Sequence, residues 1–162
     1  LPIMAQKAEN EIVGAPCGLM DQLAVYWGKA NHLLPIRCQP DEIGKPIPLP
    51  KGDYFYGIDS GIRHAVSGNP YGDARTAAFM AYSIIEQSLG TPAFIIEAAR
   101  VNKDISRLYF QGYLANVDDE EFKKKYEKLL PEVITGAEFL HQYGGLTDDL
   151  SYIDPENSYY HF

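Results

Sequence analysis

The chain begins with a pattern of apolar and polar positions that predicts two helices joined by a tight turn. Apolar residues recur at helical spacing through residues 1–12, namely Ile3, Met4, Ala8 and Ile12. We expect this helix to end at Gly14, because glycine suits a left-handed C-terminal cap and Pro16 prevents simple continuation. A second helix is expected from about Gly18 to Gly28, with five apolar residues facing inward: Leu19, Met20, Leu23, Ala24 and Trp27.

Short extended segments follow the two helices. Residues 32–38 and 43–49 are interpreted as edge strands or linker, because the prolines of the second segment lack the N–H that a central strand donates. Residues 54–59 are aromatic and β-branched and follow a good turn at residues 51–53, so we expect a stronger strand there. We place an internal boundary near residue 50.

The second half of the sequence is predicted to be mostly helical. An alanine-rich apolar stripe runs from Tyr71 to Leu89 and ends at Gly90. Residues 118–131 are expected to form a short helix whose acidic first turn and later lysines complement the helix dipole. A further helix is expected over residues 132–143. The predicted fold class is therefore α+β.

Composition and charge narrow the classes of partner. The 162 residues are 46% hydrophobic, enough for a core, and carry 22 acidic against 14 basic side chains, a formal net charge of −8. This charge repels phosphate backbones and anionic lipid, so we expect neither nucleic acid nor a membrane surface as a partner. The sequence shows no transmembrane run and no signal peptide, and Cys17 and Cys38 match no zinc spacing. These features indicate a cytoplasmic protein with two reduced thiols.

The stretch most suggestive of chemistry is GAPCGLMDQ at residues 14–22. Two glycines and a proline shape a tight turn that brings Asp21 into the first turn of the second helix. Free N–H groups and the helix dipole favour an anion there, and a carboxylate can accept or orient a hydroxyl proton. From spacing alone, a purely structural role for Asp21 at the helix start is the simpler explanation.

A second block, GIDSGIRH, occupies residues 57–64, and Tyr71 follows eight residues after Arg63. This block resembles one found in galactokinases, members of the GHMP kinase superfamily. The earlier stretch GAPCGLMDQ, preceded by AENE at residues 8–11, is similar to the region around their catalytic aspartate. The two blocks occur in the same order and at a compatible separation. The residues of both blocks resemble those of the L-arabinokinase-like branch more closely than those of typical galactokinases.

The resemblance implies roles on the sugar side of an active site. Asp21 would be the catalytic residue that accepts or polarises the anomeric hydroxyl of a sugar. Cys17 and Gly18 would line the sugar pocket, because a residue without a side chain lets the ring approach the backbone. Tyr71 would contact the sugar from the other lobe, although an alternative role as a core residue stays open.

The resemblance also implies ATP and magnesium as cofactors. Glu9 matches an acidic residue that helps to hold the magnesium ion bridging the nucleotide phosphates. Arg63 matches a catalytic arginine near those phosphates, where a fixed positive charge is useful. Two structural alternatives stay open at this point: Glu9 as a solvated charge on an amphipathic helix, and Arg63 as the ion-pair partner of Asp59 or of a neighbouring acid.

The fold implied by the resemblance has two lobes. Residues 1–50 would complete the N-terminal lobe that carries the catalytic aspartate, and residues 51–162 would form a partial, mostly helical C-terminal lobe. The family holds ATP phosphates in a loop rich in glycine and serine at a helix N-terminus, and no run of that kind occurs in the chain. We therefore expect a central fragment of the enzyme that is inactive alone.

The activity implied is that of a sugar 1-kinase, which transfers the γ-phosphoryl group of ATP to the anomeric hydroxyl of a monosaccharide. Galactose and L-arabinose are both open as substrates. Two other functions also stay open: a non-catalytic sugar-binding regulator with the kinase fold, and a structural helical module with accidental motif matches. The presence of Asp21 together with Glu9 favours the enzyme, because sugar binding alone requires no magnesium ligand.

Overall fold

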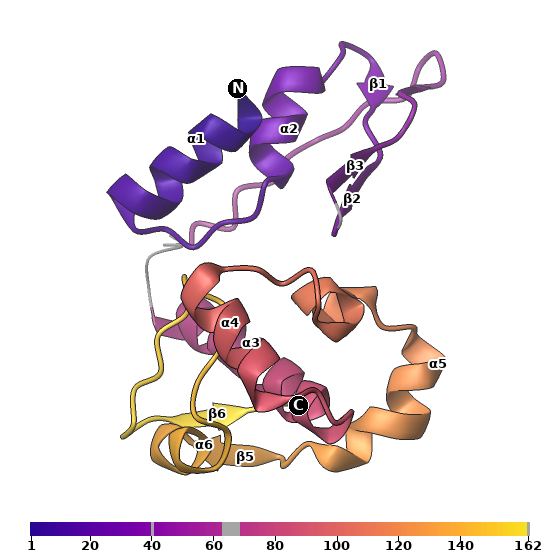
Figure 1. The fold of residues 1–162 in the computed structure, drawn as a ribbon. Coiled ribbons are helices and arrows are strands. Elements are labelled where there is room, and N and C mark those ends of the chain that lie inside the picture. The colour runs from indigo at the N-terminus through magenta and orange to yellow at the C-terminus, as the bar shows by residue number, and fades with distance from the viewer. Residues whose placement is uncertain (40, 63–68, 162) are drawn as a thin grey trace. The chain divides into compact units, whose positions relative to one another are not determined.

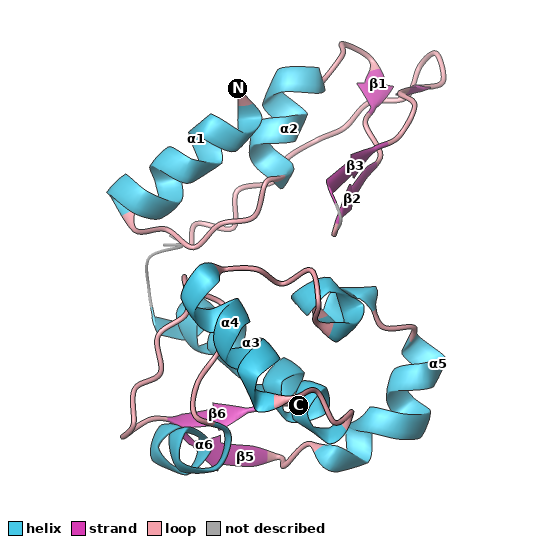
Figure 2. Cartoon of the chain, in the orientation of Figure 1, coloured by secondary structure: helices cyan, strands magenta, loops and turns pink. Residues whose placement is uncertain are grey.

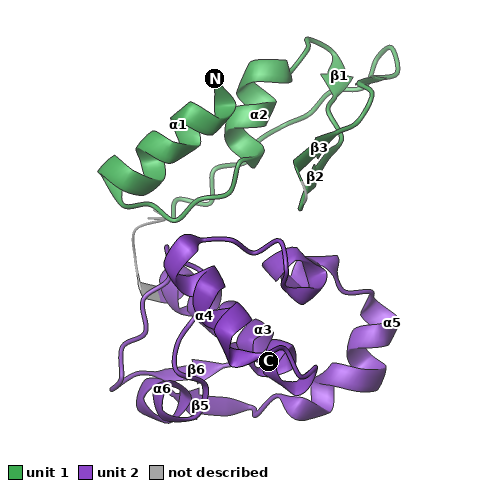
Figure 3. Cartoon of the chain, in the orientation of Figure 1, with its two compact units in different colours: residues 1–67 green, residues 68–162 purple. Residues whose placement is uncertain are grey.

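The computed structural model describes residues 1–39, 41–62 and 69–161 (Figure 1). The chain divides into two compact units, Leu1–Ser67 and Gly68–Phe162 (Figure 3). Each unit combines helices with two-stranded antiparallel pairing, two such sheets in the described part of the first unit and one in that of the second, which confirms the α+β class (Figure 2). Within the described ranges, no helix is both long and apolar enough to cross a membrane.

The first unit begins with two helices and the turn between them. α1 spans Pro2–Ala8 and continues as a π-helical turn, Glu9–Val13, which Gly14 caps with a left-handed φ of 76°. α2 spans Met20–Trp27 and ends at Gly28. The predicted helix ends are confirmed, and α2 begins slightly later than expected because the turn extends up to its first residue.

The apolar faces of these two helices are largely exposed within the unit. Leu19 and Leu23 are buried as predicted, but the side chains of Met20, Ala24 and Trp27 are exposed, so that part of the prediction is wrong. α1 contains no buried residue. Periodicity identifies which side chains share a helix face, but burial needs a second element to cover that face. Among the described residues of this unit, few elements are available to do so.

Two antiparallel ribbons complete the first unit. β1 (His32–Leu33) pairs with β4 (Ile47–Pro48), and β2 (Ile36–Cys38) pairs with β3 (Asp41–Ile43). β1, β2 and β4 lie within segments that the sequence predicts to be extended. The short pairings and the prolines agree with the interpretation of these segments as edge strands or linker.

The strand predicted over residues 54–59 does not form. The side chains of Tyr54, Phe55, Tyr56 and Ile58 are all exposed. Strand propensity reflects packing on a pleated, half-buried surface, and a strand also needs a hydrogen-bonded neighbour. None of the described residues supplies that neighbour, so the prediction is wrong for this structure.

The second unit is built around α3, and its remaining helices are short. α3 spans Asn69–Ser88, α4 spans Ala93–Asn102 and α6 spans Gly136–Tyr143. Between α4 and α6 lie α5 and four further helical turns: Tyr109–Gly112, Leu114–Asn116, α5 (Asp119–Glu121), Phe122–Tyr126 and Glu127–Leu129. The helices predicted over the alanine-rich stripe and over residues 118–131 are thereby confirmed.

The core of the second unit surrounds the middle of α3. It gathers apolar side chains from α3, the 122–130 segment, β5, α6 and β6, namely Ala77, Met80, Ala81, Ile84, Ile85, Tyr126, Leu130, Ile134, Phe139 and Tyr159. Phe139 and Ile85 are fully buried. Two alanines of the predicted stripe, Ala74 and Ala78, are exposed instead.

A small sheet and a capped helix close this core. β5 (Val133–Thr135) pairs with β6 (Ser158–Tyr160) in antiparallel register, with Ile134 opposite Tyr159. The sequence predicts helix over residues 132–143, but β5 occupies the first part and α6 begins only at Gly136. Thr135 caps α6 through a reciprocal pair of hydrogen bonds. Its side-chain hydroxyl accepts from the backbone N–H of Glu138, and the Glu138 carboxylate accepts from the backbone N–H of Thr135.

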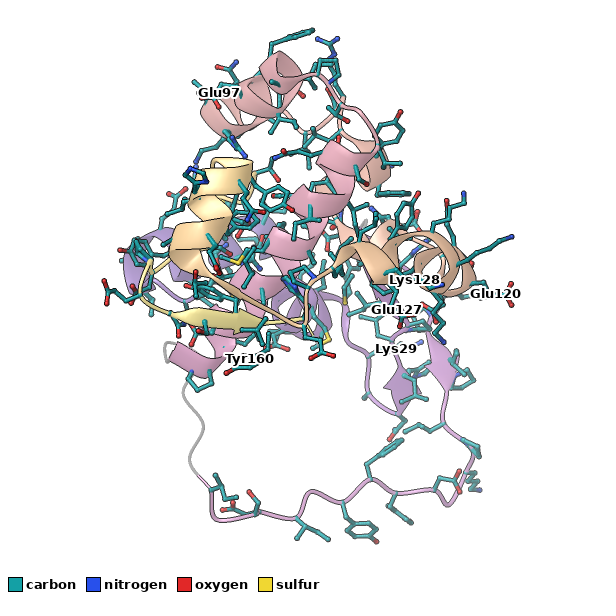
Figure 4. The ribbon with its side chains drawn as sticks, turned by 90° about the horizontal axis from the view of Figure 1, so that it is seen from below. Lys29, Glu97, Glu120, Glu127, Lys128 and Tyr160 are labelled. Atoms are coloured by element: carbon teal, nitrogen blue, oxygen red, sulfur yellow. The ribbon has the colours of Figure 1, made fainter. Side chains whose placement is uncertain are left out.

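The lysine side chains between residues 123 and 128 of the second unit are exposed on its surface. Glu120 and Lys128 are exposed on the helical stretch between residues 119 and 129 (Figure 4). Asp118 caps the start of this stretch by accepting from the N–H groups of Glu120 and Glu121, as the acidic first turn predicts. Lys125 pairs with Glu121 at 2.8 Å.

Candidate functional site

Polar side chains of the first helical segment hold the turn before α2. Asn10 Oδ1 accepts a hydrogen bond from the backbone N–H of Cys17 at 3.1 Å, and Gln6 Nε2 donates to the Cys17 carbonyl at 3.2 Å. Because Gln6 and Asn10 are four residues apart, they lie on one side of the helical segment. Cys17 is therefore fixed through both of its backbone polar groups.

The thiol of Cys17 lies within hydrogen-bond distance of three side chains. Sγ is 3.2 Å from Glu9 Oε2 and 3.4 Å from Asn10 Oδ1, and Gln22 Nε2 donates to the sulfur at 3.8 Å. Burial raises the pKa of the Cys17 thiol above its usual value, and the hydrogen bond and negative charge of Glu9 raise it further. Since the thiolate is the nucleophilic form, this cysteine is a hydrogen-bond donor and a poor nucleophile.

Asp21 lies in the first turn of α2, where the sequence predicts it. Its side chain is exposed, and no other residue in the described part of the chain forms an ion pair or side-chain hydrogen bond with it. The free N–H groups and the dipole of α2 favour a negative charge at this position. The carboxylate is thus available to a ligand.

A cavity of about 690 Å³ lies within the first unit and includes both carboxylates of interest. Its lining residues come from α1, the π-helical turn and α2: Leu1, Pro2, Met4, Ala5, Glu9, Asp21, Gln22, Val25 and Tyr26. The wall is mostly apolar, and the side chains that can orient a ligand there are those of Glu9, Asp21, Gln22 and, through its hydroxyl, Tyr26. Small-molecule sites typically combine such a wall with a few convergent polar groups.

Gly18 is not among the residues that line the cavity, and no described residue occupies the position where its side chain would be. A Cβ built on Gly18 meets no described atom within 4 Å, and its φ is outside the left-handed region. Neither crowding nor backbone strain among the described residues therefore requires a glycine here. The missing side chain leaves room for a ligand to approach the backbone at Gly18 itself.

Of the six predicted site residues, the structure describes four in the first unit: Glu9, Cys17, Gly18 and Asp21. Glu9 and Asp21 line one cavity, and Cys17 contacts Glu9. Tyr71 lies in the first turn of α3 in the second unit, where its side chain is 37% exposed and does not join the core. Arg63 lies outside the described residues.

Three polar residues around Cys17 were not predicted from the sequence as parts of the site, namely Gln6, Asn10 and Gln22. Gln6, Glu9 and Asn10 follow the i, i+3, i+4 spacing of one helix face, and this signal was present in the sequence. Gln22 gives no comparable signal, because the turn between Cys17 and α2 places its amide near the sulfur in a way that helical spacing does not show. Its side chain is 9% exposed, and Gln22 Oε1 has no hydrogen-bond partner among the described residues.

The donor set of the cavity suits a magnesium ion that is shared with a ligand. Mg²⁺ prefers oxygen ligands and commonly binds through one or two carboxylates together with substrate phosphates. Glu9 supplies such a carboxylate, and no cationic side chain in the described part of the chain pairs with it. The described residues contain no cluster of three or more His, Cys, Asp or Glu side chains that could hold a metal by themselves.

Curated relatives of the chain are sugar kinases by name. The L-arabinokinase of Arabidopsis thaliana is 36% identical over 171 residues, which cover 98% of this chain and 16% of that protein. The galactokinases of Chloroflexus aggregans and Chloroflexus aurantiacus are 41% and 38% identical over 90 residues, which cover 56% of this chain and 23% of each galactokinase. No protein-family model and no solved structure matches the chain.

These alignments agree with the two sequence blocks. The chain spans between 16% and 23% of the length of the relatives named above. The alignment with the L-arabinokinase extends over nearly the whole chain and so includes both blocks, at residues 14–22 and 57–64. By sequence, the chain is therefore related to the galactokinase and L-arabinokinase-like branch of the GHMP kinase family.

Proposed function

We propose that the chain carries the sugar-binding side of the active site of a sugar 1-kinase. The reaction would transfer the γ-phosphoryl group of ATP to the anomeric hydroxyl of a monosaccharide, giving a sugar 1-phosphate and ADP. The observation that carries this proposal is the placement of Asp21, which lines the same cavity as Glu9 and has no ion pair among the described residues. The similarity to galactokinases and an L-arabinokinase supports the same class of reaction.

Asp21 acts on the hydroxyl that attacks phosphorus. The attacking alcohol loses a proton as the new O–P bond forms, and a carboxylate within hydrogen-bond reach accepts or orients that proton. Phosphoryl transfer depends mainly on positioning and charge neutralisation. The main contribution of Asp21 is therefore the alignment of the hydroxyl, and its exposed carboxylate on the cavity wall is suited to that task.

Glu9 is the residue of the cavity best suited to bind magnesium. When bound, the ion would neutralise negative charge on the nucleotide phosphates. Glu9 Oε2 is held by the Cys17 thiol, so the carboxylate is ordered by the protein itself. The resemblance assigns Arg63 a similar task near the phosphates.

The sugar would lie against the backbone at Cys17 and Gly18, with Tyr71 contributed by the C-terminal lobe. In this proposal residues 1–50 belong to the N-terminal lobe of a two-lobed kinase and residues 51–162 to a partial C-terminal lobe. Galactose and L-arabinose differ in whether C5 bears a hydroxymethyl group. One or two residues of the pocket wall therefore decide between these sugars.

The proposal is tested with the full-length gene product in an assay that couples ADP release to each candidate sugar. We expect ADP release with galactose or L-arabinose. Asp21→Asn should lower kcat by about 100-fold or more, the range of general acid–base contributions, while sugar affinity measured by calorimetry changes little. Asp53→Asn is the matched control, because Asp53 is an exposed acid of the same unit outside the cavity.

Two outcomes would count against the proposal. An Asp21→Asn enzyme with the kcat of the wild type would remove Asp21 from the reaction. Binding of a sugar by the wild-type protein without ADP release would instead support the non-catalytic sugar-binding regulator.

A further inference from the structure

The sulfur of Cys17 joins the two helical segments of the candidate site. It lies 3.2 Å from Glu9 Oε2 on the π-helical turn and 3.8 Å from Gln22 Nε2 on α2. Gln22 follows Asp21 directly in the sequence. One side chain therefore connects the segment that carries Glu9 with the helical turn that carries Asp21.

The single proton of the thiol has two acceptors within reach. Glu9 Oε2 is at 3.2 Å and Asn10 Oδ1 is at 3.4 Å. Hydrogen bonds to an ionised acceptor are roughly twice as strong as those between neutral groups. In addition, Asn10 Oδ1 already accepts from the backbone N–H of Cys17. Distance and charge thus both direct the thiol proton to Glu9.

This hydrogen bond constrains Glu9 through one of its two carboxylate oxygens. Oε2 accepts from the thiol, and in the described part of the chain no hydrogen bond is made to Oε1. A carboxylate with one oxygen held loses rotational freedom. Hydrogen-bonding partners of this kind orient metal ligands and tune how well they bind.

We propose that Cys17 is a positioning residue of the candidate site, whose thiol holds Glu9 Oε2 and so presents Glu9 Oε1 to the cavity that Glu9 shares with Asp21. The contact of Gln22 with the sulfur ties this arrangement to α2. The catalytic consequence rests on the proposed function, since Glu9 matters to the reaction as a magnesium ligand. The hydrogen bond itself does not depend on that function.

The hydrogen bond is tested by the S–H stretching band in infrared spectra of the 162-residue chain carrying Cys38→Ala, in which Cys17 is the remaining thiol. We expect the band below the frequency of a free thiol, because donation to a carboxylate weakens the S–H bond. Glu9→Ala should move the band toward the free-thiol frequency. Glu11→Ala is the matched control and should leave it unchanged, since Glu11 is exposed and pairs with Lys7. A band that Glu9→Ala does not move would overturn the inference.

The consequence for catalysis is tested in the full-length gene product through its dependence on magnesium. Cys17→Ala should raise the half-saturating Mg²⁺ concentration about 10-fold, the size of effect expected when a partner of a metal ligand is lost. Cys17→Ser should restore most of the wild-type value, because a hydroxyl also donates to Glu9. Cys38→Ala, at an exposed position, should have no effect.

The two measurements separate this inference from the proposed function. If the wild-type protein releases no ADP with any sugar, the proposed function fails, and the infrared band still decides the hydrogen bond. If the wild type is active but Cys17→Ala and Cys17→Ser share its magnesium dependence, the positioning role is wrong and the proposed function stands. The infrared measurement leaves Cys17 in place, so it is decisive even if Cys17→Ala does not fold.

Discussion

Arg75 and Asp148 are 73 residues apart in the sequence and form a bidentate ion pair that connects α3 with the segment after α6. Arg75 Nε donates to Asp148 Oδ2 at 3.1 Å, and Nη2 donates to Oδ1 at 2.8 Å. Ser151 Oγ donates to the same carboxylate, and the guanidinium lies 5.0 Å from the centre of the Phe79 ring. Burial opposes the charge on Arg75, but the hydrogen bond and charge of Asp148 outweigh burial and raise the pKa of Arg75.

Removal of one partner of this pair should be costly. Arg75→Met leaves the Asp148 carboxylate largely buried without its cation, and we expect the free energy of unfolding to fall by about 3 kcal/mol. The double variant with Asp148→Leu should lose less, because it removes the uncompensated charge as well. Urea unfolding followed by far-UV circular dichroism measures both values.

Lys128→Ala is the matched control for this experiment, because Lys128 is an exposed cation of the same unit (Figure 4). It should change the free energy of unfolding by less than about 0.5 kcal/mol. An Arg75→Met variant no less stable than Lys128→Ala would show that the pair contributes nothing to the fold.

Gly136 is required by close packing at the start of α6. A Cβ on this residue would lie 2.0 Å from the carbonyl oxygen of Asp154, a backbone atom that cannot move aside alone. We therefore expect Gly136→Ala to destabilise the second unit by more than about 2 kcal/mol, in the range of overpacked cores. Gly72→Ala on α3 is the matched control: no described atom lies within 4 Å of its Cβ position, and the higher helix propensity of alanine should stabilise the chain by about 0.5–1 kcal/mol. Equal thermal midpoints for the two variants would contradict this account.

The stability of the second unit should depend on Tyr82 at alkaline pH. The Tyr82 hydroxyl lies 2.8 Å from Glu86 Oε2 and 2.9 Å from the Tyr109 carbonyl oxygen. Burial raises the pKa of Tyr82 well above its usual value, and the hydrogen bond and charge of Glu86 raise it further. Because the folded pKa lies above the unfolded value of about 10, the contribution of Tyr82 to stability is present below that pH and is lost as the pH rises above it.

Tyr82→Phe should therefore change the shape of the pH dependence as well as the stability. We expect it to lower the free energy of unfolding by about 1–2 kcal/mol near neutral pH, with the difference from the wild type shrinking above pH of about 10. Urea unfolding at several pH values measures both effects. Tyr160→Phe is the control, because Tyr160 is exposed on β6 (Figure 4). Parallel curves for wild type and Tyr82→Phe would contradict the predicted linkage.

The parts of the fold that sequence predicts are those that local signals determine. Gly14 and Gly28 end their helices where the periodic pattern stops, and Asp118 starts a helix by capping free N–H groups. α4 was missed, although its buried residues Ile96 and Ala99 are three apart and so fit helical spacing. The pairing of β5 with β6 joins segments distant in sequence, so neither segment shows it alone.

Some features of the candidate site could likewise be predicted from local sequence, and others could not. The position of Asp21 follows from a turn and a helix start, both of which are local, and the structure has it in the first turn of α2. The cavity depends on how α1 packs beside α2, which no single segment encodes. The contact between Gln22 and Cys17 is local to the turn before α2, but the sequence pattern does not show it. Tyr71 and Arg63 come from the second block, so their roles rest on the resemblance and stay predictions.

Gly18 offers a test that separates a functional glycine from a structural one. Because its Cβ position is open and its φ is not left-handed, Gly18→Ala should leave the thermal midpoint of unfolding within about 1 °C of the wild type. If a sugar approaches the backbone here, the added methyl group occupies part of its space. We then expect the KM for sugar in the full-length gene product to rise about 10-fold, the order of discrimination that one methyl group provides, while the KM for ATP is unchanged. Gly14→Ala should behave in the opposite way, since its φ of 76° strains alanine and lowers stability. A stable Gly18→Ala variant with the sugar KM of the wild type would show that the sugar does not lie against this turn.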